Sequence, residues 1–72
     1  MDTDKRLRAI GINIKSERIR KNLSQDDLAL ACGLSRNSLS LVETGKLNPT
    51  VFKIIDIAKR LEIDIKVILK DI

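Results

Sequence analysis

The sequence "GLS" at residues 33–35 constrains the fold most, because it separates two short segments whose apolar residues recur at helical spacing. Leu28 and Cys32 mark one face of the segment before it, and Leu39 and Val42 mark one face of the segment after it. A glycine-containing turn of three or four residues makes two short helices cross steeply, which is the helix-turn-helix unit. An ordinary helical hairpin within a bundle is the alternative.

The outward side of the helix expected after Ser35 favours the first interpretation. Solvated helix faces are normally filled with Glu and Lys, which are good helix formers. This helix instead opens with Arg36, Asn37 and Ser38 and continues with Ser40. A bundle does not explain that choice, whereas contact with another molecule does. The face opposite the apolar stripe is formed by positions 36, 37, 40, 41 and 44.

Helical spacing continues through the remaining chain, and no strand pattern appears. We expect a first helix over residues 4–21, with Leu7, Ile10 and Ile14 on one face. The expected caps of the next helices are Ser24 (with Asp27 completing a capping box), Ser35, Thr50 and Asp64. On the fourth helix the residues expected to face inward are Ile54, Ile55, Ala58 and Leu61. The prediction is an all-α, compact five-helix single domain over residues 1–72, with its helix-turn-helix motif at about 24–44 and its C-terminal helices at about 50–72.

The amino-acid composition argues against several classes of function. The chain has 72 residues, one cysteine and no histidine, so an internal disulfide and a multi-cysteine zinc site are excluded. We expect Cys32 to be a small buried apolar side chain. No acid pair, metal cluster or phosphate-binding loop is visible. We therefore expect no enzymatic activity, no cofactor and no metal.

Charge indicates the kind of partner. Residues 5–46 contain nine Lys or Arg and four acids, whereas residues 47–72 contain five and four. The basic excess thus lies in the half with the turn, which suggests a polyanion, although a basic solvated face is the common alternative. The charged start of the chain and its short apolar runs predict a cytoplasmic protein without a membrane partner.

An α-helix fits the major groove of DNA, where each base pair shows a distinct pattern of donors and acceptors. Arg36 can donate two hydrogen bonds to guanine, and Asn37 can pair with adenine. Leu41 can lie against a thymine methyl group or, alternatively, pack on a neighbouring helix. Gln25, in the first turn of the second helix, can hold a phosphate, the base-facing helix, or both. Lys46 follows the third helix and is placed for a further phosphate.

The blocks "LSQDDLALACGLS", "NSLSLVETGKLNPT" and "IIDIAKRLEI" closely resemble the phage repressor and Cro-type (xenobiotic-response-element-like) helix-turn-helix family of bacterial and phage transcription regulators. The resemblance spans roughly residues 10–70. It implies a lambda-repressor-like DNA-binding domain whose third helix lies in the major groove of double-stranded DNA, and a dimer that reads two half-sites.

By position, the resemblance assigns roles to individual residues. The base contacts would be Arg36, Asn37, Ser40 and Leu41. The phosphate contacts would be Ser24, Gln25, Ser38, Thr44 and Lys46. The family also implies a buried, structural ion pair between Arg18 and Glu43.

Two departures from the family affect expectations about turns and assembly. Glu62 stands where relatives usually carry a glycine, and Asn22 occupies another frequent glycine position. Several apolar residues, including Ile12 and Ile19, are expected to face outward. We expect a homodimer that forms through the C-terminal region, with Phe52, Ile65, Leu69 and Ile72 at the interface.

Two functions from different classes fit these observations. The first is a sequence-specific transcriptional regulator, expected to be a repressor, with a restriction-modification controller as an alternative within the class. The second is an antitoxin or other protein-interaction module on the same fold. An antitoxin usually needs an additional arm for its toxin, and we expect none beyond these helices. The sequence does not identify the operator, the effector, any protein partner or the source. It also does not decide between repression and activation.

Overall fold

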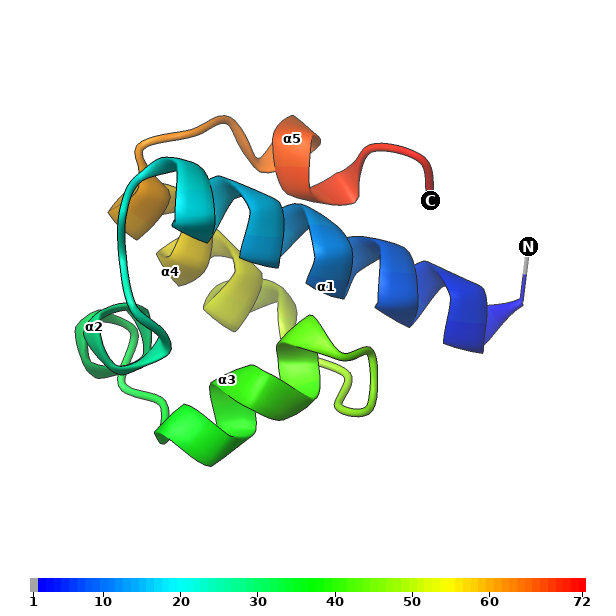
Figure 1. Cartoon of the computed structure of the whole chain (residues 1–72). Helices are drawn as coiled ribbons and strands as arrows, with labels where there is room; N and C mark the ends of the chain where they lie inside the picture. Colours follow the sequence, from blue (N-terminus) through cyan, green and yellow to red (C-terminus); the bar gives the residue numbers. More distant parts are fainter. Residues whose placement is uncertain (1) are drawn as a thin grey trace.

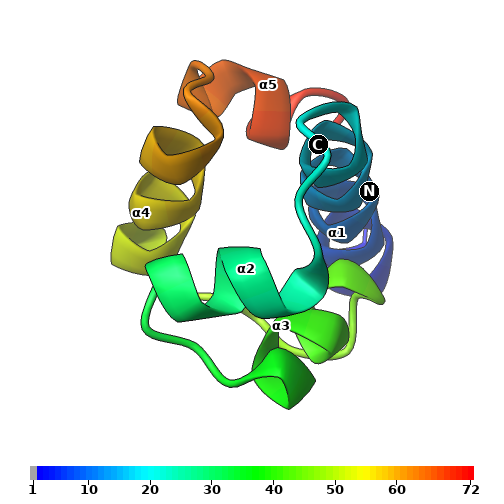
Figure 2. The ribbon, with the colours of Figure 1, turned by 60° about the vertical axis from the view of Figure 1, so that its left-hand side comes forward.

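The computed structural model describes residues 2–72, and in this part of the chain it contains five α-helices and no strand. They are α1 (Thr3–Arg20), α2 (Gln25–Ala31), α3 (Arg36–Glu43), α4 (Val51–Leu61) and α5 (Ile65–Leu69). In Figure 1, α5 lies above α1 and α3 lies below it. Figure 2 shows α1 and α4 on opposite sides of the molecule, with α5 across one end and α2 and α3 across the other. None of these helices combines the length and the apolar composition that a membrane-crossing segment needs.

Helix starts follow the predicted caps. The Ser24 hydroxyl accepts a hydrogen bond from the backbone N–H of Asp27, whose carboxylate in turn accepts from the Ser24 N–H, so the predicted capping box is present. Ser35, Thr50 and Asp64 cap α3, α4 and α5 through their side chains. The first helix begins one residue earlier than predicted, because Asp2 caps it.

The five helices enclose one apolar core. Its fully buried side chains are Ile14, Leu28, Leu39, Ile57, Leu61, Ile68 and Val42. The expectation for α4 was wrong at one position: Ile55 is only half-buried, and Ile57 is completely buried instead. The inward set at 54, 57, 58 and 61 follows the i, i+3, i+4, i+7 spacing of a helix face, and residue 55 lies at its edge. Cys32 is buried as expected, and burial raises the pKa of its thiol, which stays neutral.

Two polar contacts fix the last helices to the rest of the molecule. The Nζ of Lys53 on α4 donates to the backbone oxygen of Cys32 at the end of α2, at 2.6 Å. The buried amide of Asn13 on α1 donates to the backbone oxygens of Ile68 and Lys70, at 2.9 and 3.0 Å. These bonds satisfy carbonyl groups that helix ends leave without partners. They hold α2 against α4, and α5 against α1.

The turn after α4 places a non-glycine residue in the left-handed region of backbone conformation. Glu62 ends α4 with a φ of 58°. A residue with a Cβ carries strain on the order of 1 kcal/mol there. Asn22 also has a positive φ, of 57°, and asparagine tolerates that region better than most residues.

Candidate nucleic-acid interface

The third helix lies at the edge of the molecule. In Figures 1 and 2 it forms the lower border, and no other described element lies beneath it. Leu39 and Val42 bury its inner side, at 0% and 2% exposure. Arg36 and Asn37 are exposed at its start, whereas Leu41 is partly covered. The helix therefore presents polar side chains outward and is anchored by its apolar stripe.

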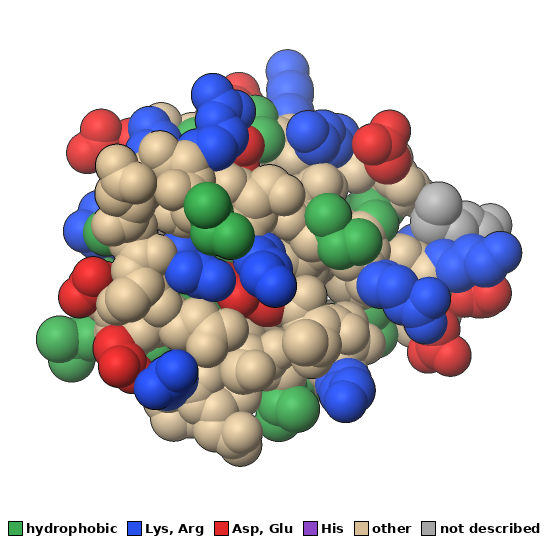
Figure 3. Space-filling view, viewed as in Figure 1, with side chains coloured by type: hydrophobic (Ala, Val, Ile, Leu, Met, Phe, Trp, Pro, Cys, Tyr) green, Lys and Arg blue, Asp and Glu red, His purple; other side chains and the backbone are tan. Residues whose placement is uncertain are grey.

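The surface over α3 carries little charge. Figure 3 shows mostly uncharged side chains and backbone along the lower face, with a basic side chain near each end and an acidic side chain beside the left one. Arg36 opens the helix, Lys46 follows it, and Glu43, the last residue of the helix, is buried on its inner side. The outward side of α3 thus offers neutral hydrogen-bonding groups, with Arg36 at its start and Lys46 after its end.

Sequence reasoning missed one basic residue at this surface, Arg8. The backbone of Arg8 on α1 lies so close to Gly45 that a Cβ added at Gly45 would be 2.8 Å from the Arg8 Cα. The exposed side chain of Arg8 thus starts from backbone that touches the loop carrying Lys46. The local signal was the basic run at residues 5–8, but only the tertiary contact places it beside the end of α3.

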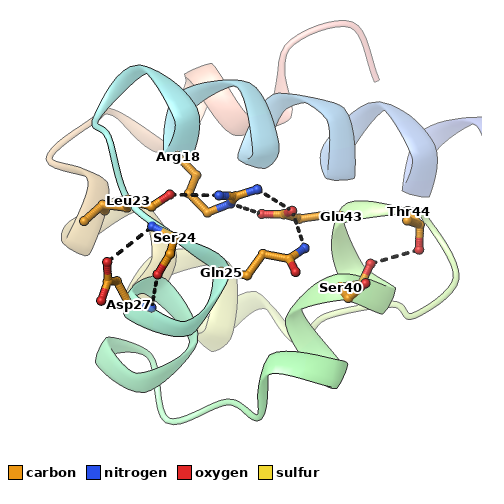
Figure 4. Close-up of polar contacts among 8 residues, drawn as sticks. All are labelled: Arg18, Leu23, Ser24, Gln25, Asp27, Ser40, Glu43 and Thr44. Atoms are coloured by element: carbon orange, nitrogen blue, oxygen red, sulfur yellow. Dashed lines mark hydrogen bonds and ion pairs between the residues drawn. The ribbon is translucent and has the colours of Figure 1, made fainter.

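A buried ion pair joins α1 to the end of α3. Arg18 Nε donates to Glu43 Oε2 at 2.7 Å, and Nη2 donates to Oε1 at 3.2 Å. The remaining guanidinium edge is also used, since Nη1 donates to the backbone oxygen of Leu23 at 2.8 Å (Figure 4). The residues are 8% and 4% exposed, respectively. One arginine thereby fixes α1, the segment before α2 and the last residue of α3 relative to one another.

Gln25, expected at a phosphate, points toward this pair. Its Nε2 donates to Glu43 Oε1 at 3.0 Å, so the side chain bridges from the first residue of α2 to the last of α3 (Figure 4). The amide has a second N–H that can donate elsewhere. In this structure, therefore, Gln25 holds α3, and its expected contact with a phosphate stays a prediction.

The hydroxyl groups expected at phosphates are engaged within their own helices. Ser24 Oγ accepts from the Asp27 N–H, and Ser38 Oγ accepts from the Ser35 hydroxyl at 2.9 Å. Both serines keep a hydroxyl hydrogen for another acceptor. Thr44 Oγ1 instead donates to the Ser40 backbone oxygen at 2.9 Å (Figure 4), so its hydrogen is already used. Donation from Thr44 to a phosphate requires rotation of that hydroxyl.

The residues expected at a dimer interface are not all brought together. Phe52 lies in the first turn of α4 and is 76% exposed. Ile65 and Leu69 lie on α5, beyond the other end of α4, and are partly buried against the core. At 1.5 Å per residue, α4 separates its two ends by about 15 Å. Ile72, 41% exposed, follows α5.

Comparisons with known proteins agree with this architecture. The helix-turn-helix family HTH_3 matches residues 14–68. The structure of the restriction-modification controller protein C.AhdI from Aeromonas hydrophila is 32% identical, with 86% of this chain and 94% of that chain covered and a TM-score of 0.83. A hypothetical transcription factor, NHTF from Neisseria, is 29% identical, with 96% and 79% covered and a TM-score of 0.85.

A second restriction-modification controller protein, C.Esp1396I, is also 32% identical, with 86% of this chain and 82% of that chain covered and a TM-score of 0.78. No curated protein matched the sequence. The family match covers most of the chain and includes α2, α3 and the turn between them. This chain belongs to the HTH_3 family of Cro/C1-type helix-turn-helix proteins.

Proposed function

We propose that this protein is a sequence-specific regulator of transcription that acts as a repressor by inserting α3 into the major groove of double-stranded DNA. The observation that carries the proposal is the outward face of α3, which offers Arg, Asn and Ser side chains while Leu39 and Val42 anchor the helix. Membership of the HTH_3 family, together with similar proteins described as transcription factors and controllers, supports it.

Within this proposal the outward residues divide into two groups. Arg36 and Asn37 read bases, because their side chains match the donor and acceptor patterns of guanine and adenine. Ser40 and Leu41, further along α3, contact bases by a hydroxyl and by apolar contact with a thymine methyl group. The proposed phosphate contacts are Ser24, Gln25, Ser38, Thr44 and Lys46. We add Arg8 to them because its backbone lies against the loop that carries Lys46. Phosphate contacts supply register and much of the affinity, whereas base contacts supply sequence preference.

We predict that Arg36→Ala removes a guanine preference from the DNA that the protein selects. Loss of a bidentate arginine–guanine contact reduces discrimination by about 1–3 kcal/mol at that position. The measurement is selection of bound duplexes from a random pool, performed with the parent protein and with the variant. An unchanged consensus after both Arg36→Ala and Asn37→Ala would show that another face reads the bases.

Lys46→Ala is the matched control, because it removes one cation from the same surface without removing a base contact. We expect it to weaken binding to all duplexes alike and to reduce the slope of log affinity against log salt by about 1. The selected consensus should be unchanged. A change in consensus would reassign Lys46 to the base-reading group.

We further propose that the protein acts as a homodimer, since a dimer places two α3 helices on two half-sites. Phe52, exposed in the first turn of α4, and Ile72, exposed after α5 at the C-terminus, provide two candidate faces. We predict that the parent protein sediments as a dimer at micromolar concentration. If the interface lies at α5, Ile72→Glu should sediment as a monomer and Phe52→Glu should remain a dimer. A parent protein that sediments only as a monomer would rule the dimer out.

Control of a restriction-modification system is a specific version of this function. Two solved controller proteins are 32% identical to this chain, and one of them is covered almost completely. Under this version, the selected consensus recurs upstream of a restriction endonuclease gene, and the protein changes transcription from that promoter in a reporter assay. A consensus that occurs only elsewhere would leave the broader regulatory function intact and remove this one.

A further inference from the structure

An acidic residue, Asp26, lies beside the proposed base-reading arginine. Asp26 is the second residue of α2, and its Oδ2 is 3.8 Å from Nη1 of Arg36 at the start of α3. Both side chains are about two-thirds exposed, at 69% and 68%. The contact is therefore a surface ion pair that crosses the turn of the motif.

The helix dipole favours an acid in the first turn of α2, where Asp26 and Asp27 both lie. The cap itself is formed by Ser24 and closed by Asp27, so the Asp26 carboxylate makes no capping bond. An exposed ion pair contributes only about 0–1 kcal/mol to stability. An acid at a surface that meets a polyanion also opposes binding. The ion pair therefore adds little stability, and the charge of Asp26 does not increase affinity for DNA.

The geometry of the pair suggests what it does. Nη1 of Arg36 approaches the carboxylate at 3.8 Å, and no hydrogen bond joins the two side chains, so the guanidinium N–H groups remain available for two parallel bonds to a planar acceptor. A distance of 3.8 Å and high exposure make the pair weak enough for a correctly placed guanine to compete with it. A phosphate, which is itself anionic, would be repelled by Asp26 as it approached Arg36.

We propose that Asp26 is a specificity-determining residue that restricts Arg36 to bases. This inference rests on the proposed DNA-binding function. On non-cognate DNA an unrestrained arginine would turn to the nearest phosphate and add sequence-independent affinity. Asp26 keeps the Arg36 guanidinium from contacting the phosphate. The ion pair between Asp26 and Arg36 breaks only where guanine offers two acceptors. Specificity increases because binding to the wrong sequence is penalised.

The test compares Asp26→Asn with the parent protein. Asparagine has nearly the same shape but no charge, so the fold is unaffected. Dissociation constants are measured at one salt concentration on the duplex selected by the parent protein and on a scrambled duplex. We expect affinity for the scrambled duplex to rise more, so that the ratio of the two affinities falls by roughly threefold to fivefold.

Asp27→Asn is the matched control, because it removes the same charge from the neighbouring residue. The Asp27 carboxylate is bonded to the Ser24 N–H and forms no pair with Arg36. It should change both affinities alike and preserve the ratio. In an Arg36→Ala background, Asp26→Asn should no longer change the ratio. An unchanged ratio for Asp26→Asn, or an equal fall for Asp27→Asn, would overturn the inference while leaving DNA binding intact. A parent protein that selects no DNA would overturn the proposed function and this inference together.

Discussion

Glu43→Ala is expected to lower the free energy of unfolding by about 3–5 kcal/mol, more than any other single substitution proposed for this protein. The variant leaves Arg18 buried without its counterion, and the Gln25 amide also loses its acceptor. A buried charge without a partner is far more unfavourable than the intact pair is favourable. In a domain of this size, each kcal/mol lowers the melting temperature by roughly 4–8 °C.

The measurement is denaturant unfolding of the parent protein and the variant, followed by selection of DNA at a temperature where both are folded. We expect a large loss of stability and the same base preference, because Glu43 lies on the buried side of α3 and not on its outward side. The control is the double variant Arg18→Met with Glu43→Leu, which removes both charges and should recover most of the stability. A Glu43→Ala variant that unfolds like the parent would show that the pair is not buried in solution.

The fold was predictable because its signals are local. Caps at Ser24, Ser35, Thr50 and Asp64 are decided by side chains that bond to backbone N–H groups two or three residues away, and a single sequence contains that information. Apolar spacing then decides which side of each helix is buried. The error at Ile55 arose where two neighbouring isoleucines compete for one inward position, and only packing against the other helices decides between them.

The candidate site was predictable in its residue types but not in its contacts. Arg8 lies beside the loop after α3, and Gln25 is bonded to Glu43. Asp26 reaches Arg36 across the turn. Each of these contacts joins two helices, so each depends on crossing geometry that spacing along one helix does not specify. Sequence identified which side chains have the appropriate chemistry, whereas the tertiary structure determines which of them share hydrogen bonds.

Gly45→Ala is expected to destabilise the protein by about 2–4 kcal/mol, through two independent effects. Gly45 has a φ of +75°, where a residue with a Cβ carries strain of about 1 kcal/mol or more. The new Cβ would also lie 2.8 Å from the Arg8 Cα and 3.0 Å from the Arg8 N, and that backbone has to move. Forcing a group into packed space typically adds about 1–3 kcal/mol.

Gly33→Ala separates the two effects, because Gly33 has nearly the same φ, +67°, but its Cβ would meet only the Lys53 Nζ at 3.7 Å. This variant should lose about 1 kcal/mol by strain alone. Denaturant unfolding of both variants therefore measures the steric term as their difference. The clash of the new Cβ with the Arg8 backbone displaces α1 from the loop carrying Lys46. Gly45→Ala should therefore also weaken binding to every duplex, while Gly33→Ala should not. Equal losses of stability would mean that α1 moves away from the loop easily, and that Arg8 is not held at the end of α3.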